Sequence, residues 1–478
     1  MSAAASWAAP APRRRGLSAP EWFLIVEMAC QLALLVPALN GGPMRVMWRV
    51  GGFAASLLLL VGLRGRTRAN AVNIAALWVI GLFLLEMLNP MSNTWISRLA
   101  VVGMAVASLA PLFWMTRLRF PEGLFERVIR LFWAYYTLGA GVGLLQVYFP
   151  GRFQPQLSPV VLGLGQDVQG LKITLANGVH IFRPMGLTDT PGGAAAAGLW
   201  AVLFGLGFLL TVRPGRHAWV QKLVYLASML AGMMIIYLSQ QRALLVVVAI
   251  WFAALLAILL WRQRWRESAL LGGLVLVLAL GSFRVAAGVG GSDMVQRVTS
   301  LGGGQGERVY RSERGTFLAQ AFGTFLPEYP LGAGLGRWGM MNQYFGDNSN
   351  PASGRIYVEI QWQGWILDGG APMLAAYVLL LLLTGWSLFR LARQRQRLWL
   401  WAALCLAYDV GAVALTFDYT PFTGQMGIEF WFLNALVLAA SSLGAGPRRA
   451  APADPLFPDR QGGEAGDPMA PASRGEGN

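Results

Sequence analysis

Long apolar segments separated by short clusters of arginine constrain the fold more than any other feature of this chain. A helix needs about 20 apolar residues to cross a bilayer. Of the 478 residues 55% are hydrophobic and only 13% are charged, which is unlike a soluble domain. The sequence predicts an all-α polytopic membrane protein with about twelve transmembrane helices, beginning near Glu21, Met44, Asn70, Trp95, Leu124, Pro191, Leu223, Ala243, Ser268, Ala371, Leu398 and Gly424.

Basic residues recur after every second apolar segment. By the positive-inside rule, the side that carries them is cytoplasmic. Both termini are therefore predicted to be cytoplasmic. The formal charge of +15 fits these topology signals better than nucleic-acid binding, so no nucleic-acid partner is expected. The clusters are Arg13 to Arg15, Arg64 to Arg68, Arg117 to Arg130, Arg213 to Lys222, Arg262 to Arg266, Arg390 to Arg397, and Arg448 with Arg449.

The same alternation divides the chain into five parts. We expect a cytoplasmic tail over residues 1–20, nine membrane helices over 21–287, a large periplasmic loop over 288–370, three helices over 371–443 and a disordered tail over 444–478. The second-longest outer loop runs from Pro150 to Thr190.

Metal and cofactor chemistry has little support in the residue types. Cys30 and Cys405 both lie in apolar segments, and the two histidines, His180 and His217, are predicted on opposite sides of the membrane. No metal or cofactor is therefore expected. His180 lies three residues before Arg183 and is a candidate acceptor-binding residue.

The large loop begins with a predicted helix. Its apolar face would hold Leu318, Ala321, Phe322 and Phe325, and Arg311 and Arg314 would extend that face toward the membrane boundary. The alternative is an interfacial helix whose arginines reach lipid headgroups.

Arginines on the outer side are the candidate anion ligands. Arg183 precedes the sixth span, Arg242 ends the hairpin SQQRALL, and Arg311, Arg314 and Arg337 lie in the large loop. A charge at such a hairpin is costly unless it is paired or faces water. The planar guanidinium matches phosphate oxygens, so these residues predict a diphosphate site.

An acceptor hydroxyl also needs a base. The outer candidates are Glu359, Asp368, Glu313 and Asp189. The alternative for Glu307 and Glu313 is an ion pair with a neighbouring arginine. For Glu359 the alternative is a pair with Arg355 at the i, i+4 spacing of a helix.

Several short motifs occur together in this order. They are RPMGLTDTPG before the sixth span, SQQRALL, the aromatic residue three positions after Arg314, PLGAG at Pro330 to Gly334, and the acidic-glycine step at Asp368 to Gly370. Over roughly Phe182 to Tyr377 the chain resembles the bacterial O-antigen ligase and O-antigen polymerase superfamily. The resemblance implies a C-type membrane glycosyltransferase that moves a glycan from undecaprenyl diphosphate to an acceptor at the periplasmic face, without a metal.

The resemblance also implies roles for single residues. Arg242 would face the diphosphate, Arg314 would be the loop arginine, and Arg183 would support both. The chain departs from the family at the His-Asn pair before the tenth span, where Glu359 occurs instead. This departure favours a polymerase of exopolysaccharide, capsule or O-antigen over a ligase that joins glycan to lipid A-core. Expected partners are the lipid-linked donor, the glycan acceptor and membrane lipid, with a flippase and a chain-length regulator as further candidates.

Two other classes of function stay open. A transporter or a flippase of lipid-linked sugar would use Glu27, Asp409 and Glu429, which lie inside apolar segments. A scaffold would explain the helices but not the outer arginines. The transferase predicts that Arg183, Arg242 and Arg314 converge at the outer side, whereas the transporter predicts a central acidic path.

Overall fold

The computed structural model describes residues 16–441, apart from 68, 119, 122, 156, 158–170, 302–307, 309 and 395–397. Residues 1–15 of the predicted N-terminal tail, the predicted tail over 444–478 and the candidate Glu307 lie outside these residues, as does the side chain of Glu313. The described helices are α1 (Ala19–Ala33), α2 (Gly42–Gly62), α3 (Ala71–Glu86), α4 (Trp95–Leu109), α5 (Pro111–Trp114), α6 (Leu124–Tyr148), α7 (Pro150–Phe153), α9 (Gly193–Thr211), α10 (Ala218–Leu238), α11 (Arg242–Trp261), α12 (Trp265–Thr299), α14 (Thr316–Gln320), α15 (Leu326–Glu328), α16 (Gly339–Phe345), α17 (Gln361–Arg393), α18 (Trp399–Leu415) and α19 (Gly424–Ser441). Strands β1 (Lys172–Thr174) and β2 (His180–Phe182) form an antiparallel hairpin.

The chain is a multi-pass helical membrane protein. Among the described residues, eight helical segments are long and apolar enough to cross a bilayer. They are Gly42–Gly62, Trp95–Arg117, Leu124–Tyr148, Gly193–Thr211, Ala218–Leu238, Arg242–Trp261, Trp265–Thr299 and Gln361–Arg393. Nine of the twelve predicted starts lie within two residues of the start of a described helix. The helices α10, α12 and α17 begin five, three and ten residues before the predicted starts near Leu223, Ser268 and Ala371. The count of twelve crossings stays a prediction, because α1, α3, α18 and α19 are shorter or less apolar than the eight.

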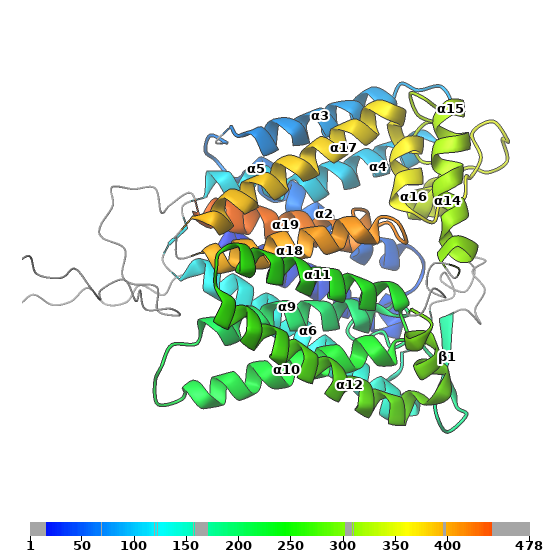
Figure 1. Ribbon diagram of the computed structural model, residues 1–478. Coiled ribbons are helices and arrows are strands. Elements are labelled where there is room, and N and C mark those ends of the chain that lie inside the picture. The colour runs from blue at the N-terminus through cyan, green and yellow to red at the C-terminus, as the bar shows by residue number, and fades with distance from the viewer. Residues whose placement is uncertain are drawn as a thin grey trace, which may run out of the picture.

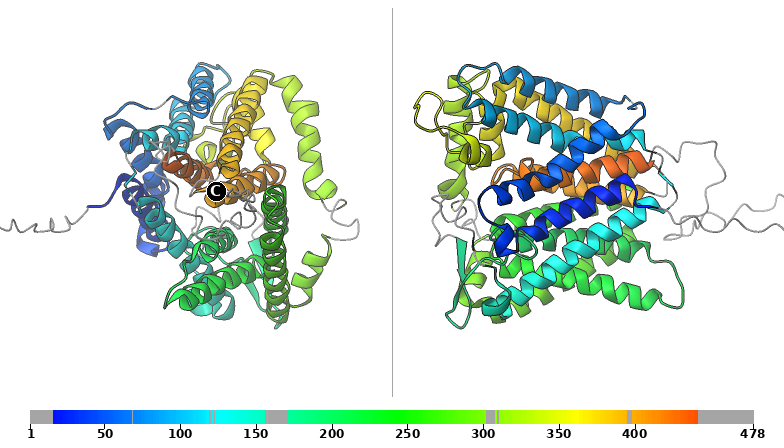
Figure 2. Two further views of the ribbon diagram at one scale, coloured as in Figure 1. Left: turned by 60° about the vertical axis from the view of Figure 1, so that its left-hand side comes forward. Right: turned by 180° about the vertical axis from the view of Figure 1, so that it is seen from behind.

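The helices lie side by side with their axes roughly along one direction (Figure 1). The short helices α14, α15 and α16 and the strand β1 gather at one end, which we call the outer end. The described chain ends with α19 at the opposite end, and the view from behind shows α1 beginning there too (Figure 2). This arrangement agrees with the predicted sides of the loops and of the chain ends.

Small residues allow the closest helix packing, between α9 and α10. A Cβ atom on Gly198 would lie 2.6 Å from the carbonyl oxygen of Gly232, so these backbones meet where only glycine fits. Aromatic side chains fill the adjoining core, as in the stacked rings of Trp200 and Phe204, whose centroids are 5.3 Å apart. The helix α9 is thereby held in the centre of the bundle, with its first residue at the outer end.

Two long helices extend into the segment predicted as the loop 288–370. The helix α12 continues to Thr299 through a kink at Gly291, where φ is 66°. The helix α17 begins at Gln361, ten residues before the predicted span, and is broken at Gly369 and Gly370 just before Pro372. Glycine and proline interrupt helices without ending them here, because the flanking residues pack against other helices.

The predicted loop helix is present from Arg311 to Glu328, with two π-helical turns at Arg311–Gly315 and Ala321–Phe325. Ala321 and Phe325 are buried against Ile366 and Leu367 of α17. Phe322, which was expected on the same face, is 42% exposed. The π-helical turns change the spacing of the buried side chains from that of a regular α-helix.

Candidate functional site

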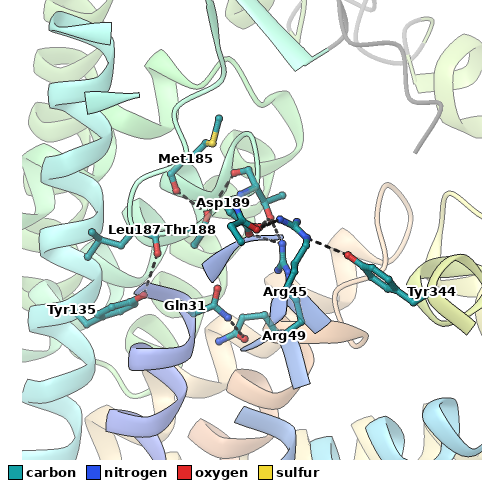
Figure 3. Close-up of polar contacts among 12 residues, drawn as sticks. Gln31, Arg45, Arg49, Tyr135, Met185, Leu187, Thr188, Asp189 and Tyr344 are labelled. Atoms are coloured by element: carbon teal, nitrogen blue, oxygen red, sulfur yellow. Dashed lines mark hydrogen bonds and ion pairs between the residues drawn. The ribbon is translucent and has the colours of Figure 1, made fainter. Parts of the chain in front are cut away.

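A buried carboxylate anchors the outer end of the bundle (Figure 3). Asp189 is 3% exposed and lies in the turn between β2 and α9. It forms ion pairs with Arg45 at 2.6 Å and with Arg49 at 2.5 Å, both from α2. Arg45 also donates to Asn40 and, at 3.2 Å, to the hydroxyl of Tyr344 in α16. Asp189, a candidate base in the sequence, therefore joins α2, α16 and the turn over residues 183–193, which we call the arginine turn.

The arginine turn is also held from the inside of the bundle. The side chain of Gln146 in α6 accepts from the backbone N–H groups of Met185 and Gly186, at 2.7 and 2.9 Å, and donates to the Gly186 carbonyl. These contacts satisfy buried backbone groups that have no partner in regular secondary structure. The turn is thereby bound to α6 as well as to α2.

The hairpin between α10 and α11 lies against this turn. A Cβ atom on Gly192, where φ is 88°, would overlap the side-chain amide of Gln241 at 1.7 Å. Glycine is required there both by the backbone conformation and by the contact. Arg242 follows Gln241 directly, so this contact brings Arg242 close to the turn that carries Arg183.

Three arginines share this region. Burial lowers the pKa of Arg183 from its ordinary value, and the positive charges of Arg297 and Arg242 lower it further. The three residues therefore lie within electrostatic range of one another, and we call them the outer arginine cluster. The Nε atom of Arg183 is buried without a hydrogen-bond partner. Like charges held together in this way favour the binding of an anion.

An apolar groove of about 350 Å³ lies between α10, α11 and α12, and its lining includes sequence neighbours of Arg242 and Arg297. Leu245, one turn beyond Arg242, and Val298, next to Arg297, both line it. Its full lining comes from α10, α11, α12 and the residues after α12: Met233, Tyr237, Leu245, Val248, Ala249, Phe252, Ala253, Leu256, Val275, Ala279, Val298 and Leu301. The groove joins a cationic outer end to a hydrocarbon-like surface.

Glu359 lies in a second charged group. Its carboxylate accepts from Arg314 Nη1, and Arg314 Nε lies 3.5 Å from Asp418. The side chains of Arg314 and Glu359 are 31% and 23% exposed, so solvent can reach both. The alternative ion pair with Arg355 at helical spacing is wrong, because residues 354–359 are not helical.

Tyr419 connects the charged groups electrostatically. It lies between α18 and α19, and desolvation of its hydroxyl raises its pKa. The charge of Arg49 lowers this pKa and that of Glu359 raises it, so both residues lie within electrostatic range of Tyr419. The loop over 416–423 thus lies between the arginine turn and the Arg314–Glu359 pair.

No protein-family model matches the chain, and no curated protein is significantly similar to it. The resemblance to the O-antigen superfamily stays a prediction from the residues.

Two of the predicted substrate-binding residues, Arg337 and Asp368, are buried and form hydrogen bonds within the protein. Arg337 is 5% exposed and donates to the carbonyls of Ala333 and Gly354, at 3.0 and 3.1 Å. Asp368 is 5% exposed and accepts from Trp338 Nε1 at 2.7 Å. Both side chains hold the loop before α17 in place, and their predicted roles in substrate binding stay predictions.

Two further candidates are exposed. His180 lies on β2, and its Nδ1 atom is 3.2 Å from the hydroxyl of Thr174. Arg311 begins the loop helix and is exposed to solvent. Their predicted roles in substrate binding stay predictions. In the part of the chain that the structure describes, no three His, Cys, Asp or Glu side chains gather as metal ligands would.

The predicted convergence of three arginines is found for two of them. Arg183 and Arg242 come together, whereas Arg314 belongs to the group of Glu359. Sequence reasoning missed Arg45, Arg49 and Arg297. The first two carried a signal, since they begin the second apolar segment on the predicted outer side, against the alternation of the other basic clusters. Arg297 had none, because only the kinked α12 brings it to the cluster.

Proposed function

We propose that this protein transfers a glycan from undecaprenyl diphosphate to an acceptor sugar at the outer face of the bacterial cytoplasmic membrane. The reaction would extend an exopolysaccharide, a capsule or an O-antigen. The donor and the growing glycan are its partners, and neither a metal nor a nucleotide cofactor takes part.

The outer arginine cluster is the observation that carries this proposal. A glycosyl diphosphate gathers negative charge on its phosphate oxygens as the sugar leaves, and fixed positive charge stabilises that transition state. Arg183 and Arg242 supply guanidinium groups whose geometry matches phosphate. Arg297 adds a third charge to the same cluster.

The apolar groove supports a lipid donor. It begins next to Arg242 and Arg297 and is lined almost entirely by hydrocarbon side chains. A diphosphate on the arginines would place the first isoprene units of its carrier in this groove. Burial of hydrocarbon would add affinity that does not depend on the sugar.

The Arg314–Glu359 pair supports the acceptor side of the reaction. The acceptor hydroxyl oxygen would form a bond to the anomeric carbon of the donor while the bond to the diphosphate oxygen breaks. The hydroxyl proton would pass to the Glu359 carboxylate, and the bonding electrons would leave with the diphosphate, which needs no general acid. Arg314 would hold Glu359 in position.

Complementation of a deletion strain tests the proposal. We expect Arg183→Ala and Arg242→Ala to abolish polymeric surface glycan and to leave lipid-linked repeat units accumulated. Arg152→Ala is the matched control, because Arg152 is exposed in the same outer loop region. Normal polymer in both cluster variants, at wild-type protein levels, would refute the transferase.

Gel analysis of the surface glycans and lipid-linked intermediates from the same strains distinguishes two alternative functions. A ligase would leave polymer intact on its lipid carrier but absent from lipid A-core. A flippase is favoured by one observation, the buried pair of Glu27 and Glu429. If the protein is a flippase, its deletion would leave the lipid-linked repeat unit at the cytoplasmic face of the membrane. A glycosidase added to the periplasm could not reach the unit there.

A further inference from the structure

Two carboxyl groups inside the bundle have no part in the proposed transfer. Glu27 of α1 is 1% exposed and Glu429 of α19 is 4% exposed. The two helices touch on both sides of this level: the rings of Phe23 and Phe432 stack at 4.9 Å, and Gln31 donates to Gln425 at 2.7 Å.

These contacts place the two carboxyl groups opposite each other. Glu27 lies about one helical turn from both Phe23 and Gln31, and Glu429 lies about one turn from both Phe432 and Gln425. Residues one turn apart share a face of a helix. Glu27 and Glu429 therefore meet across the interface of α1 and α19.

Glu429 has the partners of an ionised carboxylate. Its oxygens accept from the hydroxyl of Tyr136, from Trp200 Nε1 at 3.0 Å and from the Gln425 amide at 2.6 Å. A carboxylate is purely an acceptor, and three donors stabilise its charged form.

Glu27 has the opposite environment. Neither of its oxygens makes a hydrogen bond of good geometry. Its nearby donor is Gln31, a neutral amide that shares its two N–H groups between Glu27 and Gln425. On the α2 side it packs against Gly52, where an added Cβ would lie 3.1 Å from Glu27 Cγ. A charged carboxylate at such a position costs several kcal/mol or more.

The groups that face Glu27 offer it no positive charge. α19 presents Glu429, α6 presents Tyr135 and Tyr136, and its own helix presents Cys30. Within the described residues, neither Glu27 nor Glu429 forms an ion pair with an arginine or a lysine. Two carboxylates at this place would repel each other without compensation.

We propose that Glu27 and Glu429 form a proton-binding site in the outer half of the bundle, in which Glu27 carries the proton and Glu429 is ionised. The site lies about 8 Å below the outer ends of α1 and α19, at 1.5 Å per residue. Tyr136 binds Glu429, and the adjacent Tyr135 donates to the Leu187 carbonyl of the arginine turn at 3.3 Å. The proton site is therefore joined through α6 to the turn that carries Arg183.

Infrared difference spectra of the full-length protein in lipid nanodiscs test this assignment without any glycan substrate. Wild type minus Glu27→Gln should contain the C=O stretch of a protonated carboxyl, shifted by exchange into D2O. Wild type minus Glu429→Gln should contain the two carboxylate stretches instead. Glu126→Gln, at a partly exposed residue paired with Arg130, is the control and should show carboxylate bands alone.

Melting temperatures provide a second test, which does not depend on the infrared spectra. Glu27→Met removes the acid and leaves an apolar side chain of similar length, so a neutral Glu27 predicts a melting temperature at or above that of wild type. Glu429→Met should melt lower, because it strands three buried donors. Carboxylate bands from Glu27, a protonated band from Glu429, or bands that change with added sodium instead of pH would each overturn the proposal.

Discussion

Arg45 Nη1 lies 2.6 Å from Asp189 Oδ2, and the two side chains are only 1% and 3% exposed. Their segments are separated by more than 140 positions in the chain, and the pair joins the start of α2 to the arginine turn. Arg49 shares the same carboxylate. A buried ion pair of this kind contributes little net stability when intact, but removing one partner leaves a buried charge.

We predict that Asp189→Asn destabilises the protein by about 3–5 kcal/mol, because it leaves Arg45 buried without a counter-charge. Thermal unfolding of the detergent-solubilised protein measures the effect. Asp347→Asn is the control, since Asp347 accepts from Ser349 in an exposed loop and its loss should be small. Equal melting temperatures for the two variants would contradict the structural role of Asp189.

Arg242→Lys tests the geometry of anion binding rather than charge alone. Lysine keeps the positive charge but loses the planar fork that matches phosphate oxygens. We expect glycan transfer to fall by about tenfold, equivalent to about 1.4 kcal/mol of transition-state stabilisation. Membrane fractions assayed at matched protein levels provide the measurement, with Arg152→Lys alongside. Full activity in both Arg242→Lys and Arg242→Ala would show that Arg242 takes no part in the transfer and only influences membrane topology.

Glu359→Gln tests the base. The amide keeps the shape of the side chain and its hydrogen bond from Arg314, but it cannot take a proton. We expect loss of glycan transfer with normal protein levels and normal donor binding. Arg355→Ala should retain transfer, because Arg355 is exposed and the segment between it and Glu359 is not helical. An active Glu359→Gln protein would remove Glu359 from the mechanism.

The predicted orientation in the membrane is tested by reporter fusions. A fusion after Asn350, in the loop at the outer end, should report the periplasm. A fusion after Gly215, in the basic connection between α9 and α10, should report the cytoplasm. If both fusions reported the same compartment, the outer end could not be the face on which we place the reaction.

Much of the architecture could be predicted because its cause is local. A run of apolar residues must form a helix in a membrane, since its backbone has no other hydrogen-bond partners. The predicted starts near Met44, Leu124 and Ala243 therefore coincide with α2, α6 and α11. The glycines at Gly192 and Gly193 also gave a correct indication of close packing at the start of α9.

The partners of single charges could not be predicted, because they depend on segments far apart in the chain. Helical spacing offered Arg355 as an alternative partner of Glu359, but the backbone there is not helical and Arg314 takes that place. The sequence offered Asp189 as a candidate base on the outer side, but in the structure its carboxylate is paired with Arg45 of α2. Arg297 lay in a predicted loop, and only the kink of α12 at Gly291 brings it to Arg183 and Arg242.

The sequence by itself determined that this chain crosses a membrane many times, and it indicated which ends of its helices share a side. Those properties follow from hydrophobic length and from the distribution of arginine, which act on each segment separately. Tertiary structure decided which arginines meet which carboxylates, because a charge is neutralised by whatever packing brings within a few ångströms. The candidate site is a property of that packing, at the outer end where α2 and the hairpin between α10 and α11 contact the arginine turn.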